Sequence, residues 1–205
     1  MTVLLLDDRW PEVVPLDIIG KLAGPVTFAT EIPVKVRWNI DVLLNPGVSD
    51  SCGTYISCDE LDPEVVRRSE AGERVIAVAS RADALHQAQQ VMTRALRIGE
   101  WEQSQTHQSL LPYLHEEAAE FAEAVEQQLP DAAIKAELAD VFLQVLFHSE
   151  IASRRGAFGL ADVAESFIAK LRVRAPYLFD GTVDIVDQET QDRLWQEAKA
   201  GEKSN

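Results

Sequence analysis

Two groups of acidic residues in the second half of this 205-residue chain have the types and spacing needed to hold a metal ion. The first group is Glu116, Glu117 and Glu120, and the second is Glu137 and Asp140. On an α-helix, residues three or four apart lie on the same face, so each group can present its acids to one side. Carboxylates that converge from two helices supply the hard oxygen ligands that suit Mg²⁺ or Mn²⁺.

One acid of each group borders the apolar side of its predicted helix, whereas Glu116 and Glu120 lie farther round. Glu117 is next to the stripe that contains Phe121, and Glu137 adjoins Val141. An acid in this position can face a partner helix, whereas an acid far from the core is a solvated surface charge. Clustered carboxylates repel one another and raise each other's pKa values unless a cation neutralises them.

The acidic groups have two other interpretations. Acidic pairs at this spacing are common on helices, and most of them form a solvated face. A ferritin-like di-iron site also uses carboxylates of a helical bundle, but it needs Glu-x-x-His pairs. In this sequence no His follows a Glu at that spacing, which makes an iron-carboxylate protein a weak alternative. His148 continues the line of Glu137 and Asp140, and a satisfied core histidine is its simplest interpretation.

Amphipathic segments of the second half are predicted to form the helices that position these acids. Apolar residues recur at helical spacing, and the segments stop at glycine or proline residues. The predicted helices cover residues 85–99, 110–128, 131–153, 161–174 and 188–200, with a polar loop at 99–109. Long helices with short connections predict a mainly α fold built as a helical bundle.

The first 80 residues have a different pattern, and they hold six of the nine prolines. Short strands are predicted at residues 3–6, 26–28, 54–57 and 74–79. A helix is predicted after Asp62, with Pro63 at its first position and Gly72 at its end. This order predicts a small α/β region at residues 1–80, to which the sequence assigns no role, ahead of a helical domain at residues 82–203.

The charge of the chain disfavours two classes of partner. The 19 Lys and Arg residues stand against 34 Asp and Glu residues, which gives a net charge of −15. Binding to nucleic acid or to an anionic membrane needs a basic face, so we expect neither partner. The apolar run at residues 3–6 is too short for a signal peptide or a membrane span, and we expect a cytoplasmic protein.

Longer stretches around the acidic groups resemble the MazG family of nucleoside triphosphate pyrophosphohydrolases. The segment 101–110 leads into an EExxE motif at residues 116–120, and an ExxD motif follows at residues 137–140. The likeness continues through residues 170–179 to residues 195–199. The first half is similar to the short α/β region of actinobacterial MazG proteins.

The resemblance implies an all-α catalytic domain that hydrolyses nucleoside triphosphates to the monophosphate and pyrophosphate. It implies Mg²⁺ as cofactor (Mn²⁺ is possible), a homodimer or higher homo-oligomer, and a role in clearing non-standard or damaged nucleotides. Metal-activated water would attack the α-phosphorus. The implied metal ligands are Glu117, Glu120, Glu137 and Asp140, and the implied catalytic acids are Glu116, Glu117 and Glu120. The implied substrate-binding residues are Tyr113, Lys170, Arg174, Trp195 and Lys199.

Some of these residues have alternative roles, and several positions depart from the family pattern. A solvated basic edge is the alternative for Lys170 and Arg174, and helix packing is the alternative for Trp195. Departures from the family motifs stand at Ala136, Ala139, Val173, Ala175 and Tyr177. The metal-ligand positions keep their acids, so we expect activity. The alternative function is a non-catalytic helical module that binds a nucleotide or a protein.

Overall fold

The computed structural model describes residues 2–202, but not the side chains of residues 46–52 and 202. Residue 203 of the predicted helical domain therefore lies outside the described residues. The chain forms two compact units, Met1–Gln87 and Ala88–Asn205. The division falls within the helix α3 (Ala84–Ile98), a few residues after the predicted boundary.

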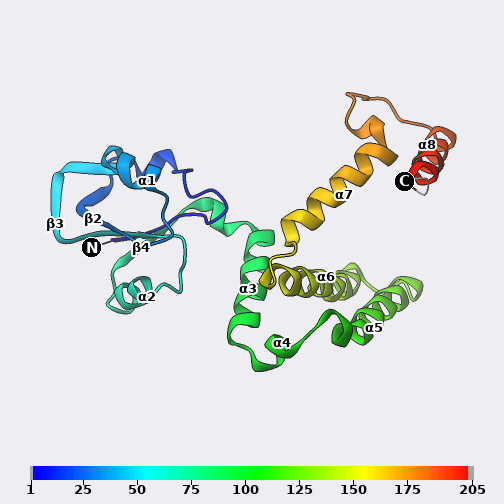
Figure 1. Ribbon diagram of the computed structural model, residues 1–205, viewed down its shortest axis with the longest axis horizontal. Coiled ribbons are helices and arrows are strands. Elements are labelled where there is room, and N and C mark those ends of the chain that lie inside the picture. Colours follow the sequence, from blue (N-terminus) through cyan, green and yellow to red (C-terminus); the bar gives the residue numbers. More distant parts are fainter. Residues whose placement is uncertain (1, 203–205) are drawn as a thin grey trace. The chain divides into compact units, whose positions relative to one another are not determined.

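The N-terminal unit is built on a parallel sheet with the strand order β2-β3-β1-β4. Its strands are β1 (Thr2–Leu5), β2 (Leu22–Phe28), β3 (Leu44–Ser57) and β4 (Arg74–Ala77). The interior strand β1 is a continuous apolar run with Val3 and Leu4 fully buried, as is typical of a parallel strand covered on both faces. The helices α1 (Val34–Asn39) and α2 (Pro63–Glu70) lie on opposite sides of the sheet (Figure 1).

The predicted α/β order is confirmed. The residues at the two ends of α2 explain why the sequence predicted this helix accurately. The Asp62 side chain accepts hydrogen bonds from the backbone N–H groups of Glu64 and Val65, and Pro63 occupies the first turn. Gly72 takes a φ of 77°, a left-handed conformation that ends the helix. The short helix α1 was not predicted, because its six residues are too few to show a helical period.

The second unit is helical, and its long helices agree with the predicted ones to within a few residues. They are α3, α4 (Glu100–Ser104), α5 (His107–Glu126), α6 (Asp131–Arg154), α7 (Leu160–Arg174) and α8 (Gln188–Glu202). The predicted polar loop at 99–109 is wrong in part, because α4 forms within it and α5 begins early. Thr106 and Ser109 cause this early start, since each hydroxyl accepts a hydrogen bond from the other residue's backbone N–H.

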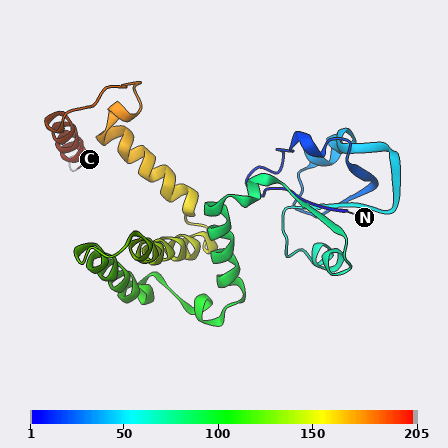
Figure 2. The same ribbon diagram turned by 180° about the vertical axis from the view of Figure 1, so that it is seen from behind.

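An antiparallel hairpin of α5 and α6 forms the centre of the helical unit, and Figures 1 and 2 both show the two helices side by side. Gln128 reverses the chain with a φ of 54°. The Leu129 N–H donates to the Ala124 carbonyl at 3.0 Å, and Pro130 then starts the second helix. The short connection sets the two helices antiparallel in close contact.

The bundle prediction is only partly met, because the helices of one chain do not enclose their apolar residues. The buried cluster is small and consists of Met92, Leu96, Leu110, Leu146 and Phe147. None of the residues of α7 is buried, and its Phe167 and Val173 are each 60% exposed. In the described part of the chain, no helix has an apolar stretch long enough to cross a membrane.

Candidate active site

The four predicted metal ligands stand opposite one another on the α5–α6 hairpin. Glu120 lies six residues before the end of α5, and Glu137 lies six residues after the start of α6. Glu117 and Asp140 each lie nine residues from the same two ends. Both helices rise by about 1.5 Å per residue, so each pair stands at a similar height along the hairpin.

Three of these carboxylates converge. Oxygen atoms of Glu117, Glu120 and Glu137 lie within 4.8 Å of one another. Glu117 and Glu137 are half-buried, whereas Glu120 is exposed. Asp140 is outside this set of three, although it is half-buried and acts electrostatically on Glu117. The hairpin therefore presents several hard oxygen donors in one place, as a divalent cation requires.

Burial raises the pKa of Glu117 above its ordinary value. The like charges of four neighbouring acids raise it further, in the order Asp140, Glu120, Glu116 and Glu137. Each of these effects disfavours the ionised carboxylate, and a bound cation would oppose all of them. The electrostatics of the hairpin thus favour occupation by positive charge.

A second group of predicted site residues lies on α7 and α8. The Arg174 guanidinium carbon is 5.1 Å from the centroid of the Trp195 ring, and the Lys199 ammonium is 6.0 Å from the same ring. Lys170 is exposed one turn before Arg174 on α7. Two cationic side chains therefore lie close to the Trp195 ring.

The third group contains Tyr113 and an aromatic residue outside the predicted site. Tyr113 is 41% exposed, and its ring meets Trp101 edge-on at a centroid separation of 5.9 Å. Trp101 contacts Phe147 with the same separation. The unpredicted helix α4 carries Trp101, so its contact with α5 and α6 could not be found from helical periods.

His148 has a partner that the sequence did not reveal. Its Nδ1 atom lies 2.8 Å from Nδ1 of His107, and the Arg155 guanidinium lies 2.9 Å from Nε2 of His107. Because arginine only donates, His107 accepts at Nε2 and donates from Nδ1. His148 then carries its proton on Nε2, and burial together with His107 lowers its pKa.

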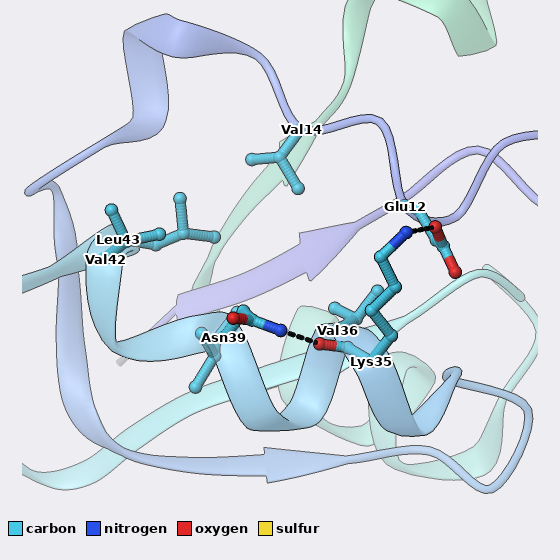
Figure 3. A pocket seen from close by; sticks show the side chains of 8 residues that line it. Glu12, Val14, Lys35, Val36, Asn39, Val42 and Leu43 are labelled. Atoms are coloured by element: carbon cyan, nitrogen blue, oxygen red, sulfur yellow. Dashed lines mark hydrogen bonds and ion pairs between the residues drawn. The ribbon is translucent and has the colours of Figure 1, made fainter.

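An apolar hollow of about 310 Å³ opens in the N-terminal unit (Figure 3). Its lining includes Val14, Val36 and Leu43, with an ion pair between Lys35 and Glu12 at one side. None of the predicted site residues lines this hollow. It therefore adds nothing to the acidic and basic groups of the helical unit.

The protein therefore combines two features. A helical unit carries clustered carboxylates on one hairpin, and a small α/β unit with a parallel sheet precedes it in the sequence. The family model of the MazG N-terminal domain matches residues 1–76. The model of the MazG nucleotide pyrophosphohydrolase domain matches residues 105–179. The chain belongs to the MazG family, which confirms the resemblance found in the sequence.

Relatives with both regions support this assignment. The chain is 36% identical to the nucleoside triphosphate pyrophosphohydrolase of Mycobacterium tuberculosis. The alignment extends over 209 residues and covers 100% of this chain. The chain is also 36% identical, over 99% of its length, to the enzyme of that name in Mycolicibacterium smegmatis. The chain spans 63% of the length of each of these relatives. A MazG protein of Thermotoga maritima is 42% identical over 104 residues, which cover 51% of this chain and 38% of that protein.

Glu117→Gln should stabilise the metal-free protein at neutral pH. The folded state raises the pKa of Glu117 above its ordinary value of 4.5, so ionisation costs more in the folded chain than in the unfolded chain. The free energy of unfolding should therefore fall as the pH rises through this window in the wild type, and the variant should lack this loss. Urea unfolding with a chelator present, at neutral pH and well below pH 4.5, measures the difference.

The matched control is Glu123→Gln, which removes an exposed charge from the same helix outside the cluster of three. Its effect should be small at either pH. An equal gain from both variants at neutral pH would contradict the electrostatic account of Glu117.

Proposed function

We propose that this protein hydrolyses nucleoside triphosphates to the nucleoside monophosphate and pyrophosphate. The observation that carries the proposal is the convergence of Glu117, Glu120 and Glu137 within 4.8 Å on one helical hairpin. The names of the two mycobacterial relatives, which match nearly the whole chain, support the same reaction. The bond to be broken joins the α-phosphorus to the oxygen that bridges it to the β-phosphorus.

The proposed cofactor is Mg²⁺, with Mn²⁺ as the other candidate. Its proposed ligands are Glu117, Glu120, Glu137 and Asp140. The donor set fits a hard cation, because it consists of carboxylate oxygens. Burial, together with repulsion from neighbouring acids, raises the pKa of Glu117. A bound ion of this kind lowers the pKa of a coordinated water and offsets phosphate charge.

Glu116 is proposed to act on the attacking water. It is exposed beside Glu117, at a position where its carboxylate can orient the water or accept its proton. Glu117 and Glu120 would hold the reacting groups from the same helix face. Their spacing on α5 keeps these acids within about one helical turn of each other.

The basic and aromatic groups are proposed to bind the substrate. Arg174 can bind two phosphate oxygens with its planar guanidinium, and Lys170 and Lys199 would add charge. Trp195, which supports two of these cations, and the exposed face of Tyr113 are proposed to contact the nucleoside. The cytoplasm is the proposed location, and non-standard or damaged nucleotides are the proposed substrates.

A binding module without catalysis is the second candidate function. It is favoured by the segment that ends α7, where Val173 is exposed and Ala175 is buried at positions with basic residues in the family motif. These side chains cannot neutralise phosphate charge. Nucleotide binding without release of pyrophosphate would support this second function.

Replacing Glu120 should abolish most of the activity. Each lost factor of ten corresponds to about 1.4 kcal/mol, and a metal ion supplies several kcal/mol to the transition state. We therefore expect Glu120→Gln to lower kcat by about 100-fold or more. Chromatography of a panel of standard and modified NTPs and dNTPs with Mg²⁺, scored for monophosphate and pyrophosphate, measures it.

Glu123→Gln is the control for that assay and should keep the wild-type rate. No turnover by the wild type with either Mg²⁺ or Mn²⁺ would refute the proposed reaction. Undiminished turnover by Glu120→Gln would refute the assignment of the acidic cluster.

Arg174→Ala should weaken substrate binding, because a charged hydrogen bond contributes about 1.5–3 kcal/mol. We expect KM to rise by about tenfold or more. Arg172→Ala is the matched control, since it removes the same charge from the same helix and its guanidinium packs on Phe179 instead. Equal changes in KM for the two variants would indicate a general charge effect rather than a phosphate contact by Arg174.

A homodimer or a higher homo-oligomer is also proposed, because it would cover apolar residues that one chain exposes. Those with the clearest exposure on α6 and α7 are Leu138, Phe167, Ile168 and Val173. Sedimentation velocity should show a dimer or larger species, and Phe167→Glu should shift it towards the monomer. Val183→Glu, at a residue that is 94% exposed outside the helices, should have no such effect. A wild-type protein that sediments as a monomer would contradict the proposal.

A further inference from the structure

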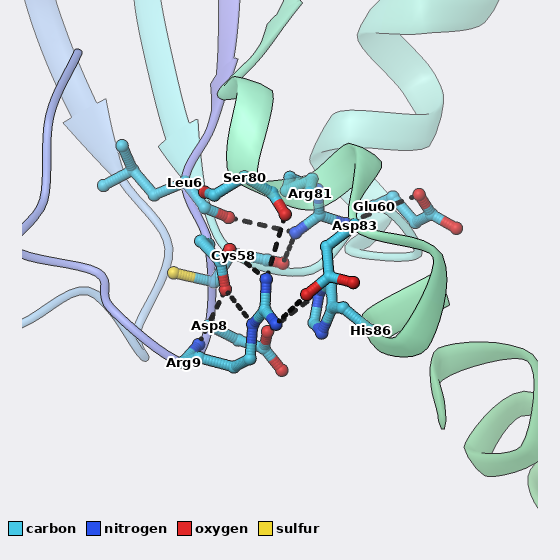
Figure 4. Close-up of polar contacts among 10 residues, drawn as sticks. Leu6, Asp8, Arg9, Cys58, Glu60, Ser80, Arg81, Asp83 and His86 are labelled. Carbon is cyan, nitrogen blue, oxygen red and sulfur yellow. Dashed lines mark hydrogen bonds and ion pairs between the residues drawn. The ribbon is translucent and has the colours of Figure 1, made fainter. Parts of the chain in front are cut away.

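Charged and polar side chains gather at the carboxyl edge of the parallel sheet, in a cluster that contains none of the proposed active-site residues (Figure 4). Strand β1 leads directly to Asp7 and Asp8, and β3 leads to Cys58. His86 comes from the first turn of α3. Open parallel sheets of α/β proteins commonly bind ligands at this edge.

Two arginines donate hydrogen bonds that link the residues at this edge of the sheet. Arg9 donates to both carboxylate oxygens of Asp7, at 3.0 and 2.9 Å, and to Asp83 at 2.8 Å. Arg81 donates to the Leu6 and Cys58 carbonyls and so ties together the ends of β1 and β3. The hydrogen bonds from Arg9 hold the pKa of Asp7 well below its usual range, although this carboxylate is only 1% exposed. Asp7 is therefore ionised and fixed in orientation.

His86 is a buried polar side chain whose hydrogen-bonding needs are unmet. The residue is 3% exposed, and within the described residues neither ring nitrogen makes a hydrogen bond. Its Nε2 atom lies 3.3 Å from Oδ1 of Asp8, a contact that is an ion pair only if the ring is protonated. Leaving a buried imidazole in this state is costly, so a ligand that binds the ring nitrogen would stabilise the site.

The geometry and the charge of the cluster both suit a dication. One donor atom from each of Asp7, Asp8 and His86 lies within 4.8 Å of the other two. The acids of the cluster and its ion pairs, namely Asp7, Asp8, Glu60 and Asp83, outnumber the arginines Arg9 and Arg81 by two. Asp8 is 46% exposed, so its carboxylate has room to move towards an ion.

We propose that Asp7, Asp8 and His86 form a second metal site, which binds a transition-metal dication of the Zn²⁺ type at the carboxyl edge of the sheet. The hydrogen bonds from Arg9 hold the Asp7 carboxylate in place, as partners of ligating carboxylates do in other metal sites. One imidazole and two carboxylates leave a position for water or for a ligand from solution.

The donor atoms distinguish this site from the acidic hairpin. An imidazole nitrogen suits zinc and related transition metals, whereas the all-carboxylate set on α5 and α6 suits Mg²⁺. Burial raises the pKa of the Cys58 thiol to about 11, and the charges of Glu31 and Asp8 add to this. Cys58 is not counted as a ligand, because it is outside the set of three residues whose donor atoms lie within 4.8 Å of one another.

The test is a Zn²⁺ titration of the full chain by calorimetry, with Glu120→Gln present in every sample to weaken the hairpin site. This background should bind one Zn²⁺ per chain at the sheet edge. Adding Asp8→Asn or His86→Gln should weaken that binding by about tenfold or more. Adding Asp17→Asn, at an exposed acid of the same unit outside the cluster, should leave the affinity unchanged.

Thermal unfolding gives a second readout, because an ion that binds only the folded state raises the melting temperature. Zn²⁺ should raise it in the Asp17→Asn control and much less in Asp8→Asn. If His86→Gln fails to fold, the exposed Asp8→Asn variant still decides the question. The proposal is overturned if the background binds no Zn²⁺, or if folded Asp8→Asn binds it as tightly as Asp17→Asn does.

Discussion

The repulsion among carboxylates on one antiparallel hairpin is the constraint on which the helical unit depends. Packing α5 against α6 places Glu117, Glu120 and Glu137 within 4.8 Å of one another, and Asp140 adds its charge to Glu117. This arrangement costs folding free energy in the absence of a cation. A bound cation would offset this cost, and the proposed hydrolysis of a charged triphosphate rests on that argument.

The pKa values of Asp7 in the N-terminal unit and Glu117 in the helical unit shift in opposite directions. In the N-terminal unit, hydrogen bonds from Arg9 lower the pKa of Asp7, so this buried carboxylate is ionised at little cost. In the helical unit, burial and like charges raise the pKa of Glu117. At the sheet edge the unmet need is instead that of a nitrogen donor, His86. This difference in donor atoms is the physical reason for proposing different classes of metal ion at the hairpin and at the sheet edge.

Much of the fold could be predicted because local signals were strong. Asp62 and Gly72 marked the ends of α2, and Pro130 marked the start of α6. The prediction failed where signals were weak or were overridden. The helix α4 is five residues long, and α5 begins at His107 because the side chains of Thr106 and Ser109 cap it inside a stretch that is polar enough to resemble a loop.

The sequence by itself determined which acids can share a helix face, because that depends only on spacing along one helix, as in Glu117 with Glu120. The MazG family likewise followed from motifs in order along the chain. Only the tertiary structure decided which residues meet across elements. The hairpin joins His107 to His148, and parallel pairing of β1 and β3 with the start of α3 joins Asp7 and Asp8 to His86. Such contacts depend on chain reversals and strand pairing, which no helical or strand period records.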